Sequence, residues 1–207
     1  MTIFDQMARQ RDWAEDERII IDQVQRVCDD IIAPNAERFD RSGDFPWENV
    51  TALNELGLNA IFVPEEFGGM PTRYALYLEC VKMISEACAS TGIIYATNFH
   101  GMKPIIDFAT AEQKQRLLPR IANGGLGALA ITEASAGSDA TRMKTRFTPD
   151  GDDIIVDGSK IFITNGDVAD LHLLFGKWSE IDDDRQSISV LAFEKGTAGF
   201  EVVRKEE

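Results

Sequence analysis

The feature that most constrains the fold is a change of hydrophobic pattern at Asn123-Gly-Gly125. Before this point apolar residues recur three and four positions apart, and after it they form short runs separated by turn residues. The first pattern is typical of amphipathic helices and the second of short strands. We therefore predict an α+β chain with a helical domain over residues 1–125 and a β domain over residues 126–207.

The helical half contains five expected segments. Ile20, Val24 and Val27 recur at helical spacing and form the apolar face of the first. In the last, Thr110 is followed three residues later by Gln113, which is the pattern of a capping box at a helix start. The expected helices cover residues 13–41, 46–57, 74–89, 93–108 and 110–123, the fourth being interrupted by Gly101 and Pro104.

The β half contains short runs that are rich in β-branched and aromatic residues. The turn signals Pro149-Asp-Gly151, Asp157-Gly158 and Asn165-Gly166 separate several of them. Antiparallel strands at this spacing are typical of a barrel or a sandwich, and we expect one of these two arrangements. The expected strands cover residues 126–132, 143–147, 154–156, 161–164, 171–175, 188–193 and 200–203.

The charge balance argues against two classes of partner. The 207 residues carry 21 Lys and Arg against 35 Asp and Glu, a formal net charge of −14. Nucleic acids and anionic membranes are bound through basic patches, so we expect neither as a partner. No apolar run of about 20 residues and no signal-type segment is recognised, which predicts a cytoplasmic protein without membrane insertion.

The cysteines and histidines show no pattern of a metal site. Cys28, Cys80 and Cys88 lie in helical patterns without a CxxC pair or a Cys/His cluster, so we expect buried free thiols rather than a disulfide framework or a zinc site. His100 and His172 are far apart in the sequence and are expected to be packing or surface residues. No metal is therefore predicted.

Two segments of the β half carry the pattern of a ligand site. One is Ala130-Ile-Thr-Glu-Ala-Ser-Ala-Gly-Ser-Asp-Ala-Thr141, and the other is Lys160-Ile-Phe-Ile-Thr-Asn-Gly166. Both are interpreted as a strand followed by a tight turn. Together they offer aromatic and aliphatic side chains for the faces of a planar ligand, and hydroxyls and main-chain groups for its polar edge.

In order and spacing, these two segments resemble the flavin-binding middle domain of the acyl-CoA dehydrogenase family. They match its Thr-Glu-x-x-x-Gly-Ser-Asp and aromatic-Ile-Thr-Asn-Gly patterns. The resemblance extends upstream through Phe62-Val-Pro-Glu-Glu-Phe-Gly-Gly69 and Thr110-Ala-Glu-Gln-Lys-Gln-Arg-Leu-Leu-Pro119. It implies a helical N-terminal domain and a β middle domain that is incomplete at Glu207, with the family's C-terminal helical domain absent.

The resemblance implies FAD as the cofactor. Thr132 would lie along the edge of the flavin ring, Thr164 would place a hydroxyl or N–H close to flavin N5, and Phe162 stands where the family usually has Trp. Ser138 would contact the substrate, with the alternative that Gly137 and Ser138 merely form a turn. The expected cofactor-binding residues are Leu129, Ile131, Thr132, Gly137, Ser138, Phe162, Ile163 and Thr164.

No catalytic residue is expected in this chain. The family's catalytic base is a Glu of the C-terminal domain, which has no counterpart here. Glu133 and Asp139 are carboxylates within the first segment, but both lie in a turn and are expected to cap backbone N–H groups. Lys160 is expected to make a structural ion pair.

The function implied is FAD-dependent α,β-dehydrogenation of an acyl-CoA thioester to the trans-2-enoyl-CoA, with this chain supplying the flavin-binding part. The implied partners are the acyl-CoA substrate and an electron-transfer flavoprotein or similar acceptor, and a homo- or hetero-oligomer is expected. Two alternatives stay open. One is a non-catalytic or accessory subunit of a heteromeric dehydrogenase, and the other is an acyl-CoA oxidase or a flavin monooxygenase on the same scaffold.

Overall fold

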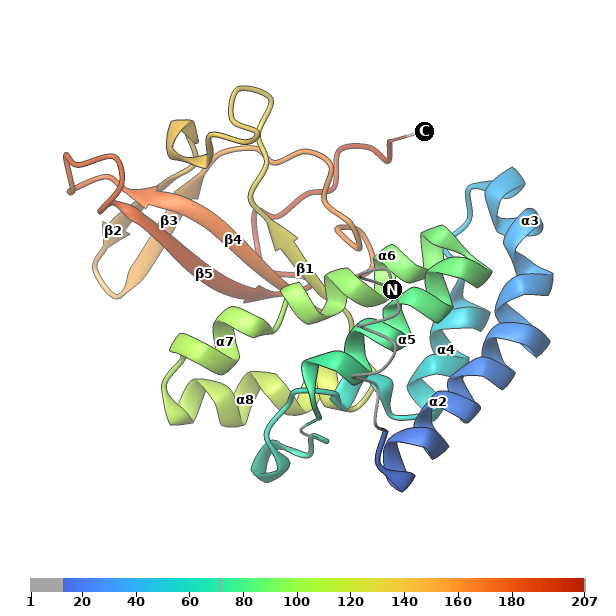
Figure 1. The fold of residues 1–207 in the computed structure, drawn as a ribbon. Helices are drawn as coiled ribbons and strands as arrows, with labels where there is room; N and C mark the ends of the chain where they lie inside the picture. Colours follow the sequence, from blue (N-terminus) through green and yellow to red (C-terminus); the bar gives the residue numbers. More distant parts are fainter. Residues whose placement is uncertain (1–12, 71, 207) are drawn as a thin grey trace, which may run out of the picture. The chain divides into compact units, whose positions relative to one another are not determined.

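The computed structural model describes residues 13–70 and 72–206 (Figure 1). The chain divides into two compact units. The first unit consists of the chain up to Leu58 together with Thr72–Gly92, and the second consists of Asn59–Pro71 together with the chain from Ile93 onward. A helical region thus precedes a sheet, as predicted, and the helices after Ile93 belong to the same unit as the sheet.

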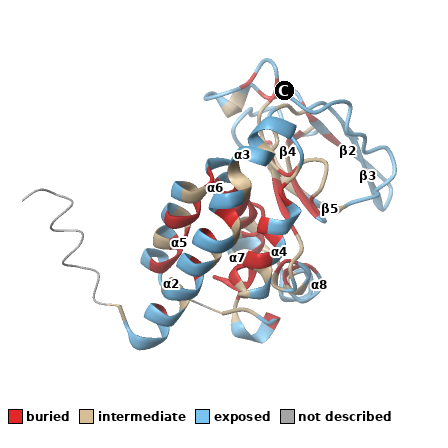
Figure 2. Ribbon diagram, turned by 90° about the vertical axis from the view of Figure 1, so that its right-hand side faces the viewer, coloured by how far each residue is buried: buried red, intermediate tan, exposed pale blue. Residues whose placement is uncertain are grey.

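The first unit is built from helices around an apolar core. Its elements are α2 (Glu15–Val27), the π-helical segment η1 (Cys28–Ile32), α3 (Ala33–Ser42), α4 (Trp47–Glu55) and α5 (Tyr74–Ala87). The first three follow one another directly and replace the single helix predicted from the spacing; Gly43, with φ 68°, ends them in a left-handed cap. Figure 2 colours the buried residues of these helices red and the exposed ones pale blue. Val24, Ile32 and Leu76 are among the buried residues.

The cysteines of this unit are buried and free, as predicted. All three thiols of the chain are free and buried. Burial raises the pKa of Cys28 to about 11 and that of Cys80 to about 12. Both groups are therefore protonated near neutral pH and are poor nucleophiles.

The second unit contains its own helices. They are η2 (Leu58–Ala60), whose first residue belongs to the first unit, η3 (Glu65–Phe67), α6 (Ala89–His100), which enters this unit at Ile93, α7 (Lys103–Phe108) and α8 (Ala111–Ala122). The capping box predicted for α8 is confirmed. The Thr110 N–H donates to Gln113 Oε1 at 2.9 Å, and the Gln113 N–H donates to Thr110 Oγ1 at 3.2 Å. None of the described helices is long and apolar enough to cross a membrane.

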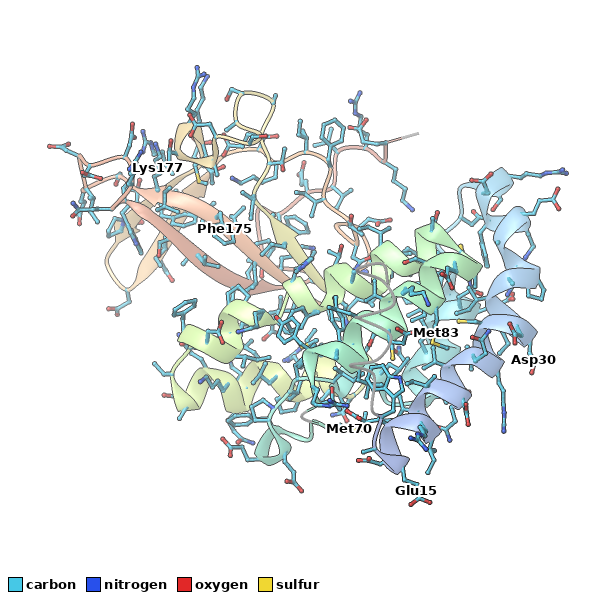
Figure 3. The ribbon with its side chains drawn as sticks, viewed as in Figure 1. Glu15, Asp30, Met70, Met83, Phe175 and Lys177 are labelled. Atoms are coloured by element: carbon cyan, nitrogen blue, oxygen red, sulfur yellow. The ribbon has the colours of Figure 1, made fainter. Side chains whose placement is uncertain are left out.

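The sheet of the second unit is organised around β4. Its elements are β1 (Gly127–Ala130), the short helix η4 (Ala140–Arg142), β2 (Arg146–Asp150), β3 (Asp153–Asp157), β4 (Leu171–Trp178) and β5 (Ile188–Glu194). The first half of β4 pairs with β1 and its last two residues pair with β2, while β5 pairs along seven residues of β4. Figure 3 labels Phe175 and Lys177 on this central strand.

The antiparallel pairing predicted for the β half is found in only part of the sheet. β1 and β2 both run parallel to β4, and only the β2–β3 and β4–β5 pairs are antiparallel, so the sheet is mixed. Long connections allow parallel pairing, and Gly127 of β1 is paired with Leu171, far along the chain. A closed barrel or sandwich stays a prediction.

Close packing near the C-terminal end of β4 explains its glycine, Gly176. A Cβ at Gly176 would lie 2.5 Å from the ring of Phe147, which is fully buried. The same ring makes an edge-on contact with Trp178, with centroids 5.8 Å apart. Aromatic packing between Phe147 and Trp178 therefore stabilises the parallel pairing of β2 with β4.

Candidate functional site

The first predicted segment begins as strand β1 and continues as a turn. Glu133 and Ala136 exchange two backbone hydrogen bonds, of 3.0 and 3.1 Å, which close this turn. Leu129 and Ile131 are partly buried, as is Thr132. The remaining predicted residues of this segment, Gly137 and Ser138, lie beyond the turn in an exposed loop, and a Cβ at Gly137 would meet no atom within 4 Å.

The second segment forms a tight turn, so the strand predicted over residues 161–164 was wrong. Phe162 has a φ of 56° and Asn165 a φ of 64°, both in the left-handed region that an extended strand cannot contain. The turn is closed by the Gly166 N–H, which donates to Ile163 O at 3.0 Å. In this turn Phe162 is 70% exposed.

Three hydrogen bonds join the two segments. The Ile161 N–H donates to Thr132 O at 2.9 Å. The Lys160 ammonium donates to Ile131 O at 2.9 Å and to Glu133 Oε1 at 2.8 Å. These bonds involve or adjoin the residues that are predicted to contact a flavin. Ile131 and Thr132 accept two of the bonds, and Phe162 follows Ile161 directly in the chain.

Glu133 is the centre of a buried polar network. Besides Lys160, its carboxylate accepts from the Lys144 N–H at 2.6 Å, the Thr145 N–H at 3.0 Å and the Thr145 hydroxyl at 2.6 Å. Burial alone would raise the pKa of Glu133, but the hydrogen bonds from Lys160 and the other donors outweigh it and lower the pKa to about 2. The carboxylate is ionised and fully engaged, which agrees with the structural role predicted for it and with the predicted ion pair of Lys160.

The other polar residues considered from the sequence have packing or surface positions. Asp139 is exposed and accepts a hydrogen bond from the Thr141 hydroxyl. His172 is buried, stacks on Phe193 with ring centroids 5.0 Å apart, and pairs its Nε2 with Gly166 O at 2.9 Å. Burial lowers its pKa and keeps the ring neutral. Within residues 13–70 and 72–206, no three His, Cys, Asp or Glu side chains are grouped to hold a metal ion.

Sequence reasoning missed two buried amides that hold β1. Asn98 of α6 accepts the Gly127 N–H through Oδ1, and Asn165 donates through Nδ2 to Gly127 O at 3.2 Å. Asn165 also donates to Ile94 O at 3.4 Å. The Asn165-Gly166 dipeptide signalled a turn, but no local signal identifies partners that lie 38 and 71 residues away.

The arrangement offers what a planar heteroaromatic ligand needs. Phe162 presents an exposed ring, and partly buried aliphatic and hydroxyl side chains lie in the segments that it adjoins. β1 is the end strand of the sheet path, and on its edge opposite β4 the backbone of Gly127 is bound by the Asn98 and Asn165 side chains rather than by one of the described strands. Flavins bind through such a combination of apolar faces and main-chain hydrogen bonds, and the residues present fit one.

Comparison with known proteins identifies the family. Residues 14–125 match the model of the acyl-CoA dehydrogenase N-terminal domain, and residues 128–207 match that of the acyl-CoA dehydrogenase middle domain. The chain belongs to the acyl-CoA dehydrogenase family. The two joined segments described above lie within the matched middle domain of this family member.

Three relatives illustrate the similarity. An acyl-CoA dehydrogenase of Bacillus subtilis is 37% identical over 177 residues, which are 84% of this chain and 46% of that protein. The solved structure described as the electron transferring flavoprotein of Acidaminococcus fermentans contains a chain with a TM-score of 0.88 and 35% identity, covering 95% of this chain and 52% of that one. The acyl-CoA dehydrogenase of Bacillus anthracis complexed with FAD has a TM-score of 0.82 and 28% identity, over 95% and 34% of the two chains. The chain thus spans about half the length of the curated relatives that it matches; for the Bacillus subtilis protein the share is 46%.

Proposed function

We propose that this chain supplies the flavin-binding part of an FAD-dependent acyl-CoA dehydrogenase. The observation that carries the proposal is the joining of the two segments by the Ile161–Thr132 and Lys160–Ile131 hydrogen bonds. Family membership and the FAD complex of the relative from Bacillus anthracis support the choice of cofactor. The reaction proposed is α,β-dehydrogenation of an acyl-CoA thioester to the trans-2-enoyl-CoA.

The proposed roles follow the predicted set of residues. Phe162 packs against the flavin ring. Thr132 and Thr164 supply polar contacts at its edge, and Ser138, in its exposed loop, contacts the thioester. The remaining members of the set, Leu129, Ile131, Gly137 and Ile163, shape the surface that the cofactor lies on. Bound flavin supplies the acceptor for the hydride removed from the substrate β carbon.

Proton abstraction is not assigned to a described residue. Glu133 is held by four donors and has a pKa of about 2, so it is a weak base. The chain's own contribution is to hold the cofactor and to orient the thioester against it.

The partners proposed are the acyl-CoA substrate and an electron-transfer flavoprotein or similar acceptor. The similarity to a chain in the Acidaminococcus fermentans flavoprotein structure supports the acceptor. A homo- or hetero-oligomer is proposed on the same family grounds. A cytoplasmic location is proposed because the three thiols are free, as is usual in a reducing compartment.

The proposal is tested by an absorption spectrum of the purified protein together with any chain that co-purifies with it, followed by anaerobic titration with a panel of acyl-CoA thioesters. An oxidised-flavin spectrum that bleaches with one thioester is the expected result. A protein that binds no flavin would overturn the proposal. Bound flavin that no thioester bleaches would favour an accessory subunit, and rapid reoxidation of the reduced flavin by oxygen would favour an oxidase or monooxygenase.

A variant pair sharpens this test. Phe162→Ala removes the exposed ring and is expected to weaken flavin binding, because a stacked ring contact is lost. Phe108→Ala removes a ring that is 86% exposed at the end of α7 and is expected to leave flavin binding unchanged. Equal flavin dissociation constants for the two variants would contradict the role given to Phe162.

A further inference from the structure

Gly127 at the start of β1 is bound by side chains on the edge that faces away from β4. Its N–H donates to Asn98 Oδ1, and its carbonyl accepts from Asn165 Nδ2 at 3.2 Å. Two amide side chains thus give Gly127 the acceptor and the donor that a neighbouring strand would otherwise supply. All three residues are buried in the second unit.

The backbone approach at this point is close enough to require glycine. A Cβ at Gly101 would lie 2.8 Å from the Gly127 Cα and carbonyl carbon, and a Cβ at Gly127 would lie 3.2 Å from the Gly101 Cα. The end of α6, including Asn98, is therefore held directly against the start of β1. Small shifts in this contact are resisted by steric overlap as well as by hydrogen bonds.

Asn165 holds the turn that follows Thr164. Its φ of 64° lies in the left-handed region, which Asn tolerates better than other residues with a side chain. Its carbonyl accepts from the Val168 N–H at 3.1 Å and the Ala169 N–H at 2.8 Å, while its side chain reaches Gly127 and Ile94. One residue therefore fixes the local turn and links it to two other elements.

Two complementary atoms of these amides are left without a partner. Asn98 Nδ2, a donor, and Asn165 Oδ1, an acceptor, are both buried and unpaired. Both amides bond the same glycine through their other atom. Buried polar groups of this kind are ordinarily satisfied by an ordered water.

We propose that Asn98, Asn165 and Gly127 form a clamp that fixes the turn after Thr164 against β1. Asn165 is then a positioning residue: it holds the Thr164 hydroxyl and N–H in place relative to the backbone edge of β1. The effect on the cofactor rests on the proposed flavin function, whereas the clamp itself does not.

The experiment compares three variants with the wild-type protein. Asn165→Gly keeps the left-handed backbone but removes the amide, and Asn98→Ala removes the other half of the clamp. Asn59→Ala is the matched control, because the buried Asn59 amide also donates to a backbone carbonyl, that of Gly125, at 3.2 Å. Each variant is purified in the same form as the wild-type protein.

The first measurement is amide hydrogen exchange in the flavin-free protein. Asn165→Gly and Asn98→Ala are each expected to speed exchange at the Gly127 amide, and Asn165→Gly also at the Val168 and Ala169 amides, by about tenfold, as loss of one net hydrogen bond predicts. Asn59→Ala is expected to leave these amides unchanged. Unchanged exchange in both clamp variants, or an equal increase in the control, would overturn the clamp.

The second measurement is the reduction potential and visible spectrum of bound flavin. Asn165→Gly is expected to shift the reduction potential and to weaken flavin binding about 3- to 10-fold. Asn59→Ala is expected to lower the free energy of unfolding by a similar amount without changing either flavin property. Faster exchange with unchanged flavin properties would reduce the clamp to a structural feature and overturn the positioning role. Wild-type protein without flavin would overturn the proposed function instead, and hydrogen exchange would still decide the clamp.

Discussion

The two segments of the candidate site are held in place by different chemistry. The first is fixed by a buried ion pair, Glu133 with Lys160, whose carboxylate takes four hydrogen bonds. The second segment supplies Lys160 to this pair and is also tied to β1 by a neutral amide, that of Asn165, which donates to the carbonyl of Gly127; the N–H of the same glycine is bound by Asn98. A buried ion pair is costly to break because one charge remains uncompensated, whereas a lost neutral hydrogen bond costs much less. The difference predicts a graded series of mutational effects.

The largest effect is expected for Lys160→Met. The substitution leaves the Glu133 carboxylate buried without its cation, which should lower the free energy of unfolding by about 3–5 kcal/mol. Urea denaturation of the flavin-free protein measures it. The double variant Glu133→Gln/Lys160→Met removes both charges and should recover much of the loss. A single variant as stable as the wild type would show that the pair does not hold the first segment.

The next effect is the pH dependence that Glu133 confers. Its pKa in the folded protein lies near 2, below its ordinary value of 4.5, so the ionised carboxylate stabilises the fold above about pH 4.5. That contribution is lost as the pH falls from about 4.5 towards 2. Stability measured across this range should fall less steeply in Glu133→Gln than in the wild type, and identical slopes would contradict the assignment.

A moderate loss of stability is expected for Gly101→Ala, because the backbones of Gly101 and Gly127 approach closely beside the clamp. Gly101→Ala places a Cβ 2.8 Å from Gly127 backbone atoms, so the end of α6 has to shift. Overpacking of this kind typically costs about 1–3 kcal/mol. Thermal and urea unfolding measure the change. A fully stable variant would mean that the contact between Gly101 and β1 is looser than the structure shows.

The smallest effect on stability is expected for Gly137→Ala. An added Cβ meets no atom within 4 Å in this exposed loop, so the free energy of unfolding should change by less than about 0.5 kcal/mol. Flavin and acyl-CoA binding are measured on the same variant. Weaker binding at unchanged stability would support a ligand role for Gly137, whereas unchanged binding would favour a simple turn.

Local sequence signals predicted the elements whose stabilising contacts are themselves local. The capping box of Thr110 and Gln113 was found as predicted, and short strands formed at most of the expected runs. An ion pair of Lys160 and the order of helices before sheet also followed the predictions, although the partner of Lys160, Glu133, was not named in advance. In each case the determining residues lie close in the sequence or the family pattern contains them.

Features that depend on distant partners were not predicted. Residues 161–164 have strand propensity, yet the left-handed Phe162 and the contacts of Asn165 with Gly127 and Ile94 make them a turn. The apolar run over residues 200–203 has no strand partner among the described residues and forms no strand. The π-helical segment η1, which starts at Cys28, interrupts the helix that apolar spacing predicted to be continuous over residues 13–41.

The central place of β4 has a consequence for how the chain folds during synthesis. The β2–β3 hairpin pairs residues that are close in sequence and can form as soon as both strands have left the ribosome. β1 must wait for Leu171–Leu174, its only strand partner among the described strands, so it spends the synthesis of some forty residues unpaired. The predicted flavin edge is thus assembled only after β4 has been synthesised, later than the β2–β3 hairpin.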